Sequence, residues 1–204
     1  TQSLIHQKIS VPMFKGFIKE HPNIDQADQL VGKIIEIMPD FMLKDDWEHY
    51  QSTKQLLYPQ LSQKEYNLLL KPTGKSNNPE QAAMIIAKTE DKFLLSADLA
   101  EVMSGIYPTP EINAVYNIYQ KAPSSKPNEI TTQFLDLHKS RYIPASHQEI
   151  CEEIYDLLHP SLHIAEIYQF LKENQIDDPV QAAQKIIDEN PDKHPFFGVI
   201  ERNN

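Results

Sequence analysis

The sequence has few of the residues that cross-link small folds or form tight turns. It has one cysteine and five glycines among 204 residues. A single cysteine excludes an internal disulfide and a cysteine-rich zinc site, and it fits a reducing compartment. Scarce glycine disfavours tight-turned β structure, whereas the plentiful Leu, Ile, Lys, Gln, Glu and Ala favour helix. The composition therefore predicts a helical protein that folds around an apolar core without disulfides or structural metal ions.

The chain also has few positive charges and no long apolar run. Its 19 lysines and arginines against 29 acidic residues give a formal net charge of −10. Such a charge repels nucleic acid, so we expect no nucleic-acid partner. No apolar stretch approaches the roughly 20 residues that span a bilayer, and the first residues lack the pattern of a secretory signal. We expect a soluble, cytoplasmic protein with no transmembrane segment.

One part of the sequence recurs along the chain. Residues 78–83 read NPEQAA, residues 178–183 read DPVQAA, and paired isoleucines follow in both. A looser third copy covers residues 29–40. An apolar segment with a lysine at or near its end precedes each copy, at 17–20, 68–71 and 170–173. Because a repeat constrains architecture more strongly than local propensity, we predict that each copy is a helix, a turn and a second helix.

Two of these turns carry the residues that typically begin helices. Asn78 and Asp178 are good N-caps, the prolines after them fit the first helical turn, and Gln81 and Gln181 complete capping boxes. In the helices that follow, paired alanines and isoleucines form one apolar stripe. Small alanines let a neighbouring helix approach closely, so we interpret this stripe as core packing rather than a partner-binding surface.

The remaining segments also favour helix. Capping signals followed by apolar positions predict helices over about 45–58, from 62, and over 97–103, 109–119, 130–137 and 146–158. No segment shows the alternation of apolar and polar residues that is typical of a β-strand. Copies separated by other helices lack the constant spacing of a regular solenoid. We therefore predict an all-α fold: an irregular multi-helix bundle that contains about three helix-turn-helix repeat units.

A domain boundary is expected at residues 122–128, which are small and polar and twice interrupted by proline. This linker would separate an N-terminal bundle with two repeat units, residues 1–121, from a C-terminal bundle with one, residues 129–204. The alternative is one continuous helical domain over residues 1–204. Because the chain begins with threonine rather than methionine, a further hypothesis is that it is a segment of a longer protein, which the full gene product would test.

Motifs for nucleotide or metal binding are incomplete. Gly74-Lys75-Ser76 matches the end of a phosphate-binding loop, but Leu69 stands where that loop needs a glycine. His159 and His163 have the four-residue spacing of helical metal ligands, but Pro160 lies between them and favours a new helix start. We therefore predict no cofactor and no metal site.

The acidic cluster of Glu152, Glu153 and Asp156 raises the question of an acid–base pair or a magnesium site. With 29 acidic residues in the chain, local clusters arise by chance. We interpret these carboxylates as the polar side of a helix.

Cys151 is the one candidate nucleophile of the thiol class. His147 precedes it and His159 follows, so an imidazole base is available in the sequence. On a helix, however, Cys151 shares a face with Ile154 and Leu158, which is typical of a small buried residue. We predict no catalytic residue, with Cys151 and His147 as the candidates if the chain is an enzyme.

Two cations and an aromatic residue, Lys139, Arg141 and Tyr142, stand together just before Pro144. They form our candidate binding surface, because such a group can recognise an anion. The alternative is that the cations only complement the negative end of the preceding helix dipole.

The repeated Gln-Ala-Ala segments at 81–83 and 181–183, their flanking isoleucines, and the frequent Gln, Asn, Lys and Ile resemble small helical modules of type IV (Dot/Icm) secreted effectors of intracellular bacteria. The resemblance covers less than half of the chain. It implies binding to host proteins or membrane lipids, and a location in the host cytosol.

These observations favour a non-catalytic helical interaction module that binds a protein partner, with an effector domain acting on a host protein as one form of it. Two alternatives stay open. One is an enzyme, or an enzyme's accessory domain, with Cys151 as its nucleophile. The other is a membrane-targeting domain that binds phosphoinositides peripherally through a local basic pocket. The oligomeric state is not predicted.

Overall fold

The computed structural model describes residues 4–7, 9–70, 78–158 and 162–190. Eleven α-helices account for most of these residues, which confirms the predicted all-α class. The helices are α1 (Val11–Glu20), α2 (Ala27–Ile37), α3 (Lys44–Gln55), α4 (Gln63–Leu70), α5 (Pro79–Thr89), α6 (Ser96–Ser104), α7 (Ile112–Tyr119), α8 (Pro127–Leu137), α9 (Gln148–Leu158), α10 (Ile164–Asn174) and α11 (Pro179–Glu189). A 3₁₀ turn, η1 (Ala145–His147), precedes α9.

The chain divides into two compact units, residues 1–97 and residues 98–204. Residues 122–128, where we predict a linker, connect α7 to α8 inside the second unit, and Pro127 already begins α8. Helices α7 and α8 pack against each other.

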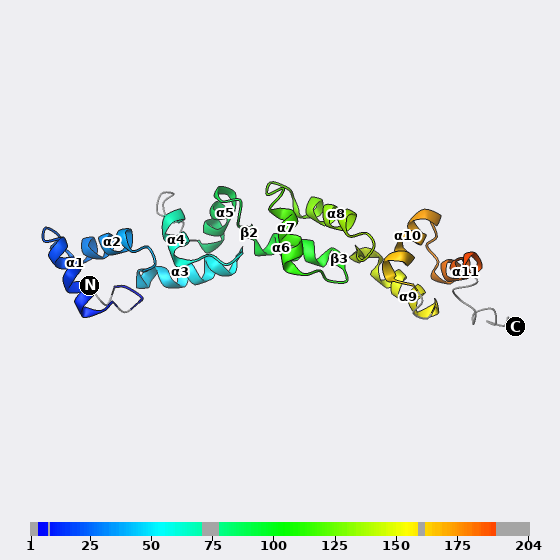
Figure 1. The fold of residues 1–204 in the computed structure, drawn as a ribbon, viewed down its shortest axis with the longest axis horizontal. Helices are drawn as coiled ribbons and strands as arrows, with labels where there is room; N and C mark the ends of the chain where they lie inside the picture. The colour runs from blue at the N-terminus through cyan, green and yellow to red at the C-terminus, as the bar shows by residue number, and fades with distance from the viewer. Residues whose placement is uncertain (1–3, 8, 71–77, 159–161, 191–204) are drawn as a thin grey trace. The chain divides into compact units, whose positions relative to one another are not determined.

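Short antiparallel β-pairings join the segment before a helix pair to the segment after it. In the first unit, β1 (Leu57–Tyr58) pairs with β2 (Leu94–Leu95) around α4 and α5 (Figure 1). In the second unit, β3 (Ile106–Tyr107) pairs with β4 (Ile143–Pro144) around α7 and α8. The single bridge between Ile5 and Leu43 encloses α1 and α2 in the same way. We call each of these three pairings a clasp.

Each clasp contains an equivalent hydrogen bond, which connects the start of the next helix to the residue before the enclosed pair. The amide of Lys44 donates to the carbonyl oxygen of Leu4 at 2.9 Å, and the amide of Ser96 donates to Leu56 at 2.8 Å. The amide of Ala145 donates to the carbonyl of Gly105 at 3.0 Å. The same connection thus recurs at intervals of roughly 50 residues. Sequence patterning did not predict these strands, because two residues are too few to show alternation.

The clasps reveal a helix pair that the sequence repeat does not show. Sequence similarity marks α1–α2, α4–α5 and α10–α11. The pair α7–α8 is enclosed by the same clasp, but Ile130 and Thr131 stand where α5 and α11 carry two alanines. The second helices of the four pairs end in the same way. The backbone amide of the residue after the helix donates to the carbonyl four residues earlier: Met38 to Ile34, Glu90 to Ile86, His138 to Phe134 and Asn190 to Ile186.

Capping side chains fix where several helices begin. The carboxamide oxygen of Asn78 accepts from the amide of Glu80 at 2.8 Å, and Asp178 accepts from the amide of Gln181 at 2.8 Å, as their N-cap pattern predicts. Ser62 and Glu65 form a reciprocal capping box at the start of α4, where the capping signal predicts a helix from residue 62. Local sequence therefore determines these helix boundaries.

Among the described residues of the first unit, two apolar clusters form the core. One gathers around α1 and α2, with Ile5 and Phe17 among its buried members. The other joins α3, α4 and α5 and includes Tyr50 and Tyr66. Asn67 on α4 donates to the carbonyls of Pro39 and Phe41 at 2.7 and 2.8 Å, which ties α4 to the loop after α2.

In the second unit, α9, α10 and α11 enclose a cluster that includes Ile154, Leu171 and Ile186. Ala182 and Ala183 belong to this cluster and let α11 pack closely on α9. In the first unit, Ala82 and Ala83 allow the same close packing of α5 on α3. The alanine pair is thus a core feature, as its stripe predicts.

The longest of the described helices has 12 residues. None of them has the length and apolar character needed to cross a lipid bilayer.

Replacing Ala182 by leucine tests the close packing of α9 and α11. Ala182 is fully buried, so the larger side chain must displace neighbours, and we expect a loss of about 1–3 kcal/mol in the free energy of unfolding. Urea denaturation followed by circular dichroism measures it. The matched control is Gln184→Leu on the exposed side of α11, which should change stability by no more than about 0.5 kcal/mol. Equal effects of both substitutions would contradict this packing.

Candidate functional site

Cys151 lies in the core of the second unit. Its side chain is fully buried in the cluster formed by α9, α10 and α11. Burial raises the pKa of its thiol to about 11. Since the thiolate is the nucleophilic form, a buried thiol that keeps its proton at neutral pH is poorly suited to attack a substrate.

His147, the proposed base for this thiol, lies in η1 at the start of α9. Its ring packs edge-on against Tyr168, with 5.0 Å between the ring centroids, and its Nδ1 lies 3.1 Å from the hydroxyl of Ser146. Both partners are neutral. No carboxylate among the described residues bonds to this ring, so the arrangement lacks the third group that orients a catalytic imidazole.

The structure keeps Arg141 against Tyr142 but does not present the three residues of the predicted anion-binding surface as one exposed group. Tyr142 turns inward, where its ring meets Phe134 at a centroid distance of 5.0 Å. The Arg141 guanidinium lies over the Tyr142 ring, 5.5 Å from its centroid. Lys139 instead lines a hollow of about 600 Å³ together with two carboxylates, Glu166 and Glu173. These acidic neighbours oppose an anionic ligand.

The described part of the chain contains no group of three His, Cys, Asp or Glu side chains placed to hold a metal ion. His159 and the segment Gly74-Lys75-Ser76 lie outside the described residues.

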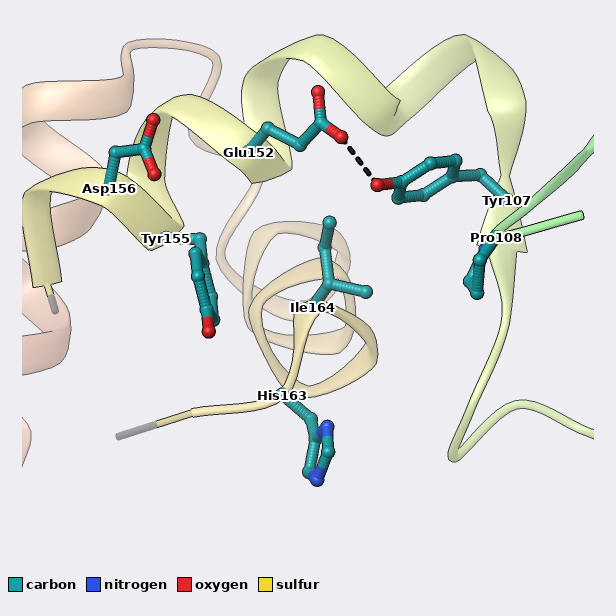
Figure 2. A pocket seen from close by; sticks show the side chains of 7 residues that line it. All are labelled: Tyr107, Pro108, Glu152, Tyr155, Asp156, His163 and Ile164. Carbon is teal, nitrogen blue, oxygen red and sulfur yellow. Dashed lines mark hydrogen bonds between the residues drawn. The ribbon is translucent and has the colours of Figure 1, made fainter. Parts of the chain in front are cut away.

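A second hollow, of about 520 Å³, lies where β3, α9 and the start of α10 meet. We call it the α9–α10 hollow. Figure 2 shows its lining residues, which are Tyr107, Pro108, Glu152, Tyr155, Asp156, His163 and Ile164. The clasp between β3 and β4 places Tyr107 beside α9, although 45 residues separate Tyr107 from Glu152.

Glu152 is held in place by two hydrogen bonds. The Tyr107 hydroxyl donates to Oε1 of Glu152, and the side-chain amide of Gln148 donates to the same oxygen at 3.1 Å. The bond to the carboxylate, together with burial, raises the pKa of the Tyr107 phenol. Tyr107 therefore stays protonated at neutral pH and acts as a fixed donor.

Asp156 and Tyr155 extend the hollow along α9. Asp156 stands one helical turn after Glu152, so both carboxylates lie on one side of the helix. The Tyr155 ring is half-buried and packs against the core of the second unit. His163 lies on the far side of the hollow in Figure 2, and its backbone amide donates to Glu166 at 2.8 Å to cap α10.

Sequence reasoning found only part of this site. The acidic cluster of Glu152 and Asp156 is visible in the sequence, where its pattern indicates the polar side of a helix. Tyr107 carried no signal of its own, because the clasp that brings it to α9 depends on pairing between distant residues. The tyrosine-proline step of Tyr107-Pro108 recurs at Tyr58-Pro59, and this recurrence is a sequence signal that could have marked the position.

The sequence matches no protein-family model, and comparisons with curated proteins and with solved structures gave no significant match.

The burial of Cys151 predicts a thiol that is inert in the folded protein. With its pKa raised to about 11, the thiolate is scarce at pH 7–8 and grows only as the pH rises toward that value. We expect iodoacetamide to alkylate Cys151 at least about 100-fold more slowly in the folded chain than in urea, as measured by mass spectrometry. Rapid labelling of the folded chain at pH 7 would contradict the burial and favour the enzyme alternative.

Proposed function

We propose that this chain is a non-catalytic helical interaction module that binds a protein partner at the α9–α10 hollow. The observation that carries the proposal is the hollow itself, which is lined by Tyr107 from β3 and by Tyr155 and two carboxylates from α9. Its volume, about 520 Å³, lies within the range of sites that accept a small ligand or an anchoring side chain.

The composition of the hollow is typical of protein recognition. Tyrosine is enriched among the residues that dominate binding energy, because its ring supplies a large rigid contact area and its hydroxyl a polar contact. Tyr107 and Tyr155 provide two such rings. The clasp and the bond to Glu152 fix Tyr107 before a partner arrives, which lowers the ordering cost of association.

The two alternative functions have less support. The buried thiol of Cys151 weighs against a cysteine enzyme. The carboxylates beside Lys139 weigh against a phosphoinositide headgroup. The resemblance to secreted effector modules favours a host protein as the partner and the host cytosol as its location.

Photocrosslinking from the hollow, followed by reconstitution, tests the proposal. A benzoylphenylalanine at position 163, an exposed position in the lining of the hollow, should crosslink to a partner that the same probe at Glu153, an exposed position outside the hollow, does not capture. The identified partner is then purified, and its affinity for the full chain is measured by calorimetry. Substitution of Tyr155 by leucine keeps apolar packing but removes the ring, so we expect at least about a 10-fold loss of affinity.

The matched control is Leu157→Ala, on the same helix but outside the hollow, which should leave affinity within about twofold. Circular dichroism verifies that both variants stay folded. A purified partner that binds the Tyr155→Leu chain as tightly as the unaltered chain would exclude the α9–α10 hollow as its binding site.

A further inference from the structure

We infer that the α9–α10 hollow receives the guanidinium group of an arginine side chain on the partner. This inference rests on the proposed function and names the chemistry of the group that the hollow binds. It follows from the charge of the hollow, from the open oxygens of its carboxylates and from the position of its aromatic rings.

The charge of the hollow is complementary to a cation. Its lining includes Glu152 and Asp156 but no lysine or arginine. Neither carboxylate forms a salt bridge with the described residues. A cation that enters the hollow would therefore meet two negative groups that the described part of the chain leaves unneutralised, inside a concave wall that limits screening by water.

The carboxylates also have oxygens available for hydrogen bonds. Both donors to Glu152, from Tyr107 and Gln148, converge on Oε1, so Oε2 has no donor among the described residues. Asp156 accepts no hydrogen bond from the described residues. Because Glu152 is already oriented by its two bonds, a ligand donor can reach Oε2 without first ordering that side chain.

The aromatic walls favour guanidinium over ammonium. Tyr107 and Tyr155 line the same hollow as the carboxylates (Figure 2). A planar guanidinium can stack on a tyrosine ring while its N–H groups donate to a carboxylate, whereas the compact, strongly hydrated ammonium of lysine gains less from a ring face. A divalent metal ion fits poorly, because Glu152, Asp156 and His163 are not placed together to hold one among the described residues.

A titration with small probes tests the guanidinium directly. The full chain, labelled with ¹³C in its tyrosine rings, is titrated with N-acetyl-L-arginine amide and observed by NMR. We expect saturable shifts of the Tyr107 and Tyr155 signals. N-acetyl-L-citrulline amide, which has nearly the same shape but no charge, should bind about 10-fold more weakly, and so should N-acetyl-L-lysine amide.

Charge-neutralising variants locate the effect. Asp156→Asn should weaken arginine binding about 10-fold, because it removes a charge-assisted contact without changing the size of the side chain. The matched control is Glu153→Gln, which removes one negative charge from the exposed face of α9 outside the hollow and should change affinity by less than about twofold. Equal binding of citrulline or lysine, an absent response, or an unaffected Asp156→Asn chain would each overturn the inference.

The inference and the proposed function can fail separately. A partner whose binding depends on Tyr155 but not on Asp156 would support the interaction site and refute the arginine. Arginine binding in a chain whose purified partner ignores the Tyr155→Leu substitution would support the chemistry of the hollow and refute its role in that partnership.

Discussion

The clasp is the interaction on which the rest of this structure depends. A pair of helices joined by a turn does not by itself fix the position in space of the helix that follows the pair. In each clasp, a residue before the pair bonds to a residue after it, and the next helix starts from that point. One backbone hydrogen bond contributes only about 1 kcal/mol, so the clasp acts mainly by fixing position, while apolar clusters supply most of the stability.

The candidate site is a direct consequence of one clasp. Pairing of β3 with β4 carries Tyr107 to the side of α9, where its hydroxyl meets Glu152. The helix then adds Tyr155 and Asp156 at positions fixed by its own periodicity, and the start of α10 completes the wall. The hollow therefore depends on one long-range contact, between Tyr107 and Glu152, and on the regular geometry of α9 and α10. Together they bring a few side chains to one place.

The sequence predicts those features that arise from neighbouring residues. Asn78, Asp178 and Ser62 cap the helices that their patterns indicate, and Cys151 is buried as its helical face requires. The clasps escaped prediction because two-residue strands show no alternation, and the pair α7–α8 was missed because Ile130 replaces the repeated alanine. Tyr107 was missed for the same physical reason: its contact with Glu152 is created by pairing across a whole helix pair.

Amide hydrogen exchange at three positions tests the clasps most directly. The amides of Lys44, Ser96 and Ala145 each donate to a carbonyl at the start of the enclosed helix pair. If the clasps organise the fold, all three amides should exchange on the order of 100-fold or more slowly than in an unstructured peptide. Exchange of these amides at unstructured rates, while the helices around them remain protected, would contradict the account.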